Sequence, residues 1–275
     1  MNEYVEVYRA LRLPEGALAV FTADISLPIY AVVPPEDYGF PPALVPMWSR
    51  DNPSYVGYWK HWFTERPGTY VQMYIDGGRR ADEIARSFDQ LVRAVVLESV
   101  TEDEGVVPRT RTFASRVGIS EEELEQIDAI SAETGDELSG LLTLDAFASD
   151  APRRIADEAG GEYNGRFPSV ARPDSLRHSC DLEVPPNSRA SIAPEGVPPW
   201  YGVQDQRPVF QELLDRGDLE GAWFSLNSSG WAFAEAKQAI TDLRDQARKT
   251  GEVEAGFEAV VDAWLAQPHE KAGSF

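Results

Sequence analysis

The chain has 275 residues, 43% of them hydrophobic and 11% aromatic, which is enough to build one large domain or two smaller ones. Its 46 acidic residues against 25 basic ones give a formal net charge of -21 at pH 7. A surface this acidic repels phosphate groups, which argues against direct nucleic-acid binding and against docking on anionic lipid. The same charge attracts basic proteins, although plain solubility explains it without any partner.

The sequence predicts a cytoplasmic protein. A single cysteine, Cys180, excludes an internal disulfide framework. No window approaches 18 consecutive apolar residues, so no membrane span is expected. The first twenty residues lack a basic segment followed by a continuous apolar run, so they do not predict a signal peptide.

The first hundred residues predict mixed α and β structure. Turn signals end at Pro53 and at Gly68, and each is followed by a run of aromatic and β-branched residues. Such runs predict four strands, at 17–23, 28–33, 54–63 and 69–75.

The period of the apolar residues then changes from that of a strand to that of a helix. One helical stripe over residues 79–98 contains Ile84, Phe88, Leu91, Val92 and Val95. The preceding Asp76-Gly77-Gly78-Arg79-Arg80 would place amides and two arginines at a helix start, where an anion can bind. A glycine turn with solvated arginines is the preferred interpretation, because the pattern matches no phosphate-binding motif.

Residues 101–160 predict further helices. Ser120 and Glu123 form a capping-box pattern ahead of a helix that Gly135 ends, and a short helix is expected over 152–159. Eight prolines between residues 164 and 208 then predict an irregular connection. Four helical stripes follow it.

The predicted fold class is α+β. An N-terminal antiparallel or mixed sheet with a covering helix is followed by a helical C-terminal module. The predicted division is 1–163 for the α+β domain, 164–207 for the proline-rich connection and 208–275 for the helical module.

No complete catalytic, cofactor or metal signature is present in the sequence. His178 and Cys180 lie two residues apart, but a cysteine nucleophile needs a base in contact and a group that orients it. A zinc site would need two more ligands, and His61 and His269 are the histidines that remain. We therefore predict no catalytic, cofactor-binding or metal-binding residue here.

An enzyme remains the alternative hypothesis. It would be a hydrolase that uses His61 or two of the acids flanking the predicted strands. These acids are Asp24, Glu36, Asp37, Glu65 and Asp76.

The aromatic segment at 48–63 is the feature for which a function competes with plain core packing. It holds three of the seven tryptophans, and aromatic side chains dominate both cores and protein interfaces. If it is exposed, the segment and its neighbouring acids predict a partner-binding site. That site comprises Trp48, Asp51, Tyr55, Tyr58, Trp59, Trp62 and Glu65.

Residues 28–98 resemble a known family through three short motifs. PPEDY (34–38), GFPPAL (39–44) and YVGYW (55–59), with Trp48 between the last two, are similar to motifs of the SUKH superfamily of bacterial immunity proteins. That family carries a proline–acidic entry, an aromatic hairpin with a small residue, and a following helix. Its long helix and proline–acidic element usually come first, whereas here two predicted strands do.

The resemblance implies a non-enzymatic cytoplasmic protein that binds and neutralises a toxin, often a nuclease, delivered by a neighbouring cell. The acidic composition is compatible with such a role, because many nuclease toxins are basic. A regulatory protein-binding partner is the broader form of the same hypothesis. The resemblance transfers no individual binding residue to this chain.

Overall fold

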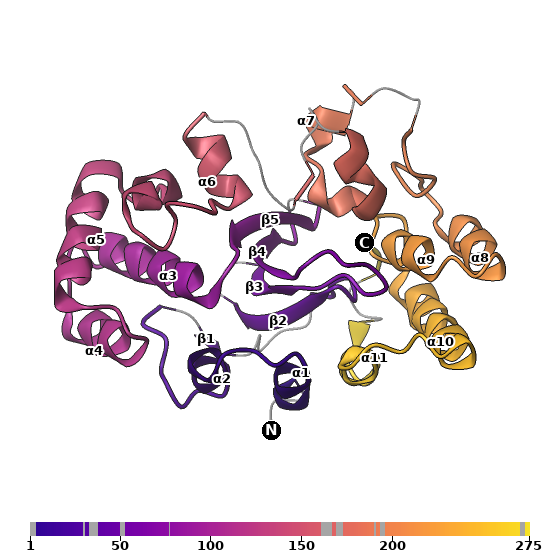
Figure 1. Ribbon diagram of the computed structural model, residues 1–275, viewed down its shortest axis with the longest axis horizontal. Coiled ribbons are helices and arrows are strands. Elements are labelled where there is room, and N and C mark those ends of the chain that lie inside the picture. The colour runs from indigo at the N-terminus through magenta and orange to yellow at the C-terminus, as the bar shows by residue number, and fades with distance from the viewer. Residues whose placement is uncertain are drawn as a thin grey trace.

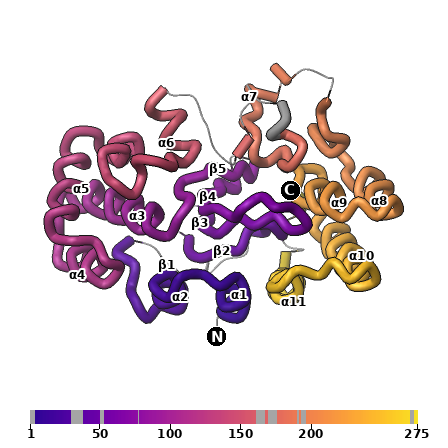
Figure 2. The backbone as a smooth tube through the Cα atoms, viewed as in Figure 1, coloured from indigo at the N-terminus to yellow at the C-terminus, as the bar shows by residue number. Residues whose placement is uncertain are grey.

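The structure is a computed structural model in which a central sheet lies between two groups of helices (Figure 1). It describes residues 4–29, 31–32, 38–49, 53–76, 78–160, 167–168, 173–189, 191–192, 196–269 and 273–275. The smooth backbone trace shows the same arrangement, with helices from the middle of the chain on one side and the C-terminal helices on the other (Figure 2).

Two helices precede the sheet, α1 (Val5–Ala10) and α2 (Glu15–Phe21). The strand predicted over 17–23 is therefore wrong. Ala17, Val20 and Phe21 are all buried, and their i, i+3, i+4 spacing is that of a helix face. The β-branched and aromatic composition of this run favoured a strand, but its burial follows the helical period.

The sheet has five strands in the order β1-β2-β3-β4-β5, and every neighbouring pair is antiparallel. This confirms the strand predicted at 69–75 and parts of those predicted at 54–63 and 28–33, while residues 60–63 lie in the loop after β3. The strands are β1 (Ala31–Val32), β2 (Leu44–Ser49), β3 (Ser54–Trp59), β4 (Thr69–Tyr74) and β5 (Arg80–Ala85).

Strand β2 was not predicted because Pro46 interrupts its apolar run, and proline is unfavourable inside a sheet. The structure accommodates the proline at an irregularity, since the β2–β3 register shifts between Pro46 and Trp48. The Pro46 carbonyl accepts a hydrogen bond from the Tyr8 hydroxyl at 2.5 Å. This contact fixes helix α1 on the sheet.

The helix predicted over 79–98 begins later than expected. Residues 80–85 form β5, and helix α3 (Phe88–Glu102) starts after Ser87, whose side chain accepts from the Gln90 amide. The predicted stripe combined Ile84 of β5 with residues of α3, because both face the same core. Pairing with β4 decides that this short segment is a strand.

The helix predicted between Ser120 and Gly135 and the one predicted over 152–159 are both present. Within the described residues, short helical turns follow them. Ser120 accepts from the Glu123 amide at 3.1 Å, and Gly135, at φ 66°, ends the helix. The Glu123 carboxylate binds Arg93 at 2.6 Å and 3.0 Å instead of completing the capping box. The elements are α4 (Pro108–Arg116), α5 (Glu121–Thr134), η1 (Leu138–Thr143), α6 (Arg153–Glu158), η2 (Pro173–His178), η3 (Asp181–Glu183) and α7 (Pro186–Arg189).

All four helices predicted after residue 208 are confirmed. They are α8 (Arg207–Asp215), α9 (Leu219–Leu226), α10 (Phe233–Thr250) and α11 (Phe257–Leu265). The fold is thus α+β with a helical C-terminal part. Buried side chains of the sheet and of these helices belong to one hydrophobic cluster. Two hydrogen bonds join them across it, from the Ala43 amide to Asn227 at 2.6 Å and from the Trp264 indole to the Phe40 carbonyl at 2.9 Å. The boundaries at 163 and 207 stay a prediction.

Candidate functional site

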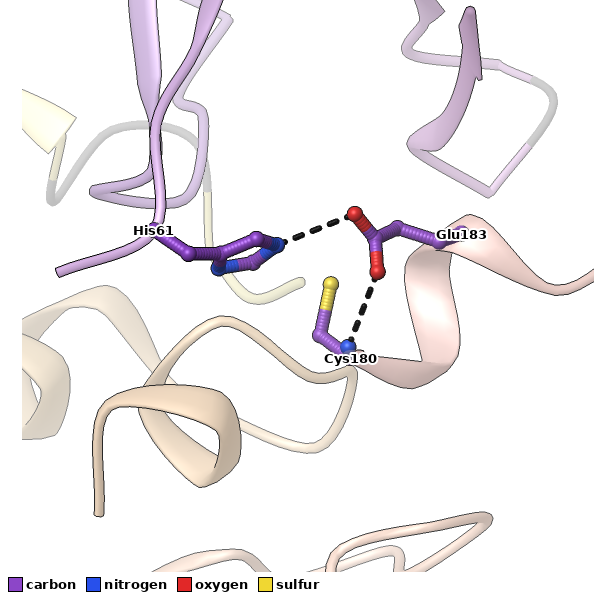
Figure 3. A group of neighbouring side chains, drawn as sticks. All are labelled: His61, Cys180 and Glu183. Atoms are coloured by element: carbon purple, nitrogen blue, oxygen red, sulfur yellow. Dashed lines mark hydrogen bonds and ion pairs between the residues drawn. The ribbon is translucent and has the colours of Figure 1, made fainter. Parts of the chain in front are cut away.

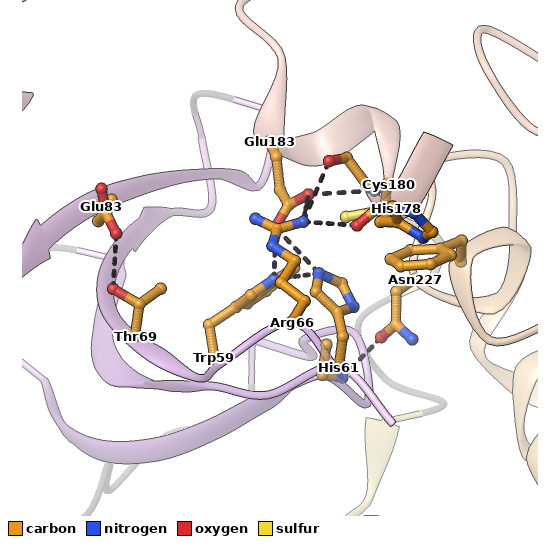
Figure 4. Close-up of polar contacts among 12 residues, drawn as sticks. Trp59, His61, Arg66, Thr69, Glu83, His178, Cys180, Glu183 and Asn227 are labelled. Atoms are coloured by element: carbon orange, nitrogen blue, oxygen red, sulfur yellow. Dashed lines mark hydrogen bonds and ion pairs between the residues drawn. The ribbon is translucent and has the colours of Figure 1, made fainter. Parts of the chain in front are cut away.

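A buried polar cluster lies where the loop after β3 meets η3 and α9 (Figures 3 and 4). We call it the His61 cluster, and it comprises His61, Arg66, Cys180 and Glu183. His61 is 2% exposed, and Cys180 and Glu183 are 0% exposed. Ionisable side chains are rarely buried this deeply unless they are paired, so their partners determine what the cluster does.

The Glu183 side chain is oriented by its own helical turn. Cys180 is the N-cap of η3, and its amide donates to Glu183 Oε2 at 3.1 Å in a capping box. The Arg153 guanidinium holds the Glu183 carbonyl at 2.6 Å. These contacts turn the carboxylate toward the loop after β3, from which His61 and Arg66 extend.

Arg66 and Glu183 form a two-pronged ion pair. Arg66 Nη1 donates to Glu183 Oε2 at 2.8 Å, and Nη2 lies 2.7 Å from Oε1. Burial by itself would raise the pKa of Glu183, but Arg66 and then His61 outweigh it and lower that pKa to about 2. The carboxylate is therefore ionised at neutral pH.

His61 is neutral in this arrangement. The Trp223 indole donates to His61 Nδ1 at 3.2 Å, so Nδ1 carries no proton. The proton is then on Nε2, which lies 2.9 Å from Glu183 Oε1 and donates to it. The Trp59 indole, 2.9 Å from the same oxygen, donates there as well. Burial lowers the pKa of His61, which agrees with the neutral form.

Cys180 is a thiol and not a thiolate. Burial, followed by the nearby carboxylates of Glu183 and Asp181, raises the pKa of Cys180 well above its ordinary value. The nucleophilic form of cysteine is the thiolate. Together with the complete burial of Cys180, this leaves the cluster unsuited to nucleophilic catalysis.

The cluster also fits a metal ion poorly. One ligand atom each from His61, Cys180 and Glu183 lie within 4.8 Å of one another, as in a metal site (Figure 3). However, both Glu183 oxygens face the Arg66 guanidinium, and a cation bound there would lie beside that positive charge. The geometry instead makes the cluster a polar cross-link that holds η3 and α9 to the sheet.

Four of the seven predicted partner-binding side chains lie in the core. Trp48 and Tyr55 are 0% exposed, and Trp59 and Trp62 are 1% exposed, so these rings present no surface to a partner. Of the two interpretations of the aromatic segment, core packing is the one that describes them.

The other three residues predicted for the site differ from those four. The Tyr58 ring is half-buried and packs edge-on against Tyr70, with ring centroids 5.2 Å apart. Glu65 is exposed, and Asp51 lies outside the described residues. Binding through these three residues stays a prediction.

The acids named for a hydrolase are not gathered around His61. Asp24, Glu65 and Asp76 are exposed, and Glu36 and Asp37 lie outside the described residues. The carboxylate that contacts His61 belongs to Glu183, which the sequence reasoning missed. The capping-box spacing from Cys180 to Glu183 was the available signal for it. This placement disfavours the hydrolase.

Two further sequence features have structural explanations. Residue 80 begins strand β5, so Gly78 and Arg79 precede a strand rather than a helix. Arg79 donates to the carbonyl oxygens of Gly39 and Tyr38, at 3.3 Å and 2.9 Å. His178 pairs with Glu220 at 2.5 Å, and its side chain is 41% exposed. Neither feature forms an anion-binding or catalytic site among the described residues.

Comparison with protein-family models, with curated proteins and with solved structures finds no match to this chain. Among the described residues, the helices are too short or too polar to cross a membrane.

Proposed function

We propose that this protein is a cytoplasmic immunity-type protein, related to the SUKH superfamily, that binds and neutralises a basic toxin. The observation that carries the proposal is the order of elements around the aromatic hairpin β2–β3. Helices precede the sheet and helix α3 follows it, as the resemblance implies, although α1 and α2 have six and seven residues where that family has one long helix. Of the two strands predicted to come first, the one at 17–23 is replaced by α2, and the one at 28–33 is present in part as the two-residue β1.

The small residue of the hairpin also has a physical reason. A Cβ atom at Gly57 would lie 2.6 Å from the Val45 carbonyl oxygen and 2.7 Å from a Leu44 methyl group. The close approach of β2 and β3 therefore requires glycine at this position. This requirement supports the resemblance, in which a small residue interrupts the aromatic hairpin.

The chemistry of the proposed partner follows from the surface. Leu142, at 37%, is the single large hydrophobic side chain that counts as exposed in the described part of the chain. The net charge is -21. A surface with few apolar anchors and a strong negative field binds through charge complementarity, which favours a basic partner. A regulatory protein partner of the same charge is the broader form of the proposal.

The test is to purify the protein together with the toxin domain encoded beside its gene. We expect a complex whose dissociation constant rises with salt, and loss of the toxin's activity at equimolar protein. Glu65→Lys, a charge reversal at an exposed predicted contact, should slow association. Glu252→Lys, an exposed reversal after α10, is the charge-matched control. No complex at low salt, or a complex in which the toxin stays active, would contradict the proposal.

A further inference from the structure

A small cavity of about 80 Å³ lies between the sheet and helix α3, on the side of the sheet where Figure 1 shows α3. Its floor is a row of side chains from three neighbouring strands, because Trp48 pairs with Val56 and Val56 pairs with Gln72. Its roof is one face of α3, whose members are spaced i, i+3, i+4 and i+7. They are Leu91, Ala94, Val95 and Glu98. Ile84 of β5 and Leu138 of η1 also line the cavity, so most of its wall is apolar.

Gln72 places a buried carboxamide in this otherwise apolar floor. The residue is 6% exposed. Arg154 Nη1 donates to the Gln72 oxygen Oε1 at 3.0 Å, and arginine can only donate, so this contact distinguishes the oxygen of the amide from its nitrogen. Within the described residues, Nε2 of Gln72 donates to no acceptor. A buried donor without an acceptor costs free energy, and the cavity is the space from which an acceptor can reach it.

The charged groups that line the cavity give neither sign of charge an advantage. Asp136 is exposed, and Glu98 already has an interaction partner. Arg154 carries the opposite charge, and it binds Glu158 at 3.0 Å as well as Gln72. A cation would meet Arg154 there, and an anion would meet the carboxylates. A neutral occupant avoids both repulsions.

We propose that this cavity is a binding site for a small neutral molecule that carries a carbonyl oxygen on a short apolar body. The carbonyl accepts a hydrogen bond from Nε2 of Gln72, and the apolar body packs against Val56, Leu91 and Ala94. An apolar cavity of about 150 Å³ in another protein binds benzene, so about half that volume suits roughly three or four non-hydrogen atoms. The site lies inside the molecule, so the inference does not depend on the proposed function.

The experiment is an NMR titration of the full chain with acetone, a neutral carbonyl compound of the size that the cavity suits. We expect saturable shifts of the Gln72 side-chain amide and of the Val56 methyl groups. The dissociation constant should be on the order of 1 mM, because so small a ligand makes few contacts. Acetate and the isopropylammonium ion have as many non-hydrogen atoms as acetone and carry opposite charges, and both should bind more weakly.

Gln72→Leu removes the amide donors and keeps a side chain of similar size. It should weaken acetone binding by about twofold to tenfold, which is the contribution of one neutral hydrogen bond. Xenon has no acceptor and enters dry apolar cavities, so it should bind the variant at least as well as wild type, which shows that the cavity is still open. Gln126→Leu, the same change at an exposed position on α5, is the matched control and should bind acetone as wild type does.

Any of three results would overturn the inference. Acetone without saturable shifts at Gln72 and Val56 would mean that the cavity holds water only. Equal binding of acetate or isopropylammonium would refute the neutral occupant, and equal acetone binding by wild type and Gln72→Leu would refute the hydrogen bond. If Gln72→Leu does not fold or takes up no xenon, wild type decides the last point. Acetone should then move the Gln72 amide protons downfield and xenon should not, and equal shifts would refute the hydrogen bond.

Discussion

Replacing Glu183 with glutamine tests the description of the His61 cluster most directly. The substitution keeps the shape of the side chain and removes its charge, so the Arg66 side chain, which is 8% exposed, loses its ionised partner. Removing one partner of a buried ion pair costs about 3–5 kcal/mol of folding free energy, because the other charge remains buried. We expect Glu183→Gln to lose stability of this order at neutral pH.

The pKa of Glu183 gives an independent magnitude and its sign. The carboxyl has a pKa of about 2 in the folded protein against an ordinary value of 4.5. The difference of about 2.5 pKa units corresponds to about 3 kcal/mol. Because the folded-state pKa is the lower one, this stability is fully present above pH 4.5 and is lost as the pH falls from 4.5 toward 2.

The assay is urea unfolding followed by tryptophan fluorescence, at neutral pH and in steps down to about pH 3. Wild type should lose more stability than Glu183→Gln over the acid range, because the variant has no carboxylate at position 183 to protonate. Glu65→Gln, on the loop that carries His61 and Arg66, is the matched control. Its side chain is exposed, so it should change stability by at most about 0.5 kcal/mol. A Glu183→Gln variant with wild-type stability and a wild-type acid profile would refute the reasoning.

Three further predictions concern neighbouring residues. Burial lowers the pKa of His61 below 6.5, so wild type should lose stability as the pH falls below 6.5. The melting temperature of His61→Gln should fall less than that of wild type as the pH drops below 6.5. An equal fall in the two proteins would contradict this. Trp59→Ala truncates a core side chain and should cost about 3–5 kcal/mol of unfolding free energy, whereas Leu142→Ala, at an exposed side chain, should cost less than about 1 kcal/mol. Similar urea midpoints for the two variants would place Trp59 outside the core. Gly57→Ala should cost about 1–3 kcal/mol because its Cβ would strike β2, and a wild-type melting temperature would disprove that contact.

The sequence by itself determined the elements whose signals are local. Helix α5 was predicted from its cap at Ser120 and its stop at Gly135, and the C-terminal helices from their apolar stripes. Strands β3 and β4 followed from aromatic runs after turn signals. These were sufficient for the α+β class, because caps, turns and period act within a few residues of one another.

The tertiary structure alone decided the rest. Strand β5 exists because β4 pairs with it, and α2 because one of its faces is buried; neither partner is visible in a short window of sequence. Whether Trp59 packs in the core or faces solvent depends likewise on distant segments. His61 and Glu183 are separated by 122 positions, and no local pattern relates them. Folding brings them together because a buried carboxylate must find its donors wherever the chain supplies them.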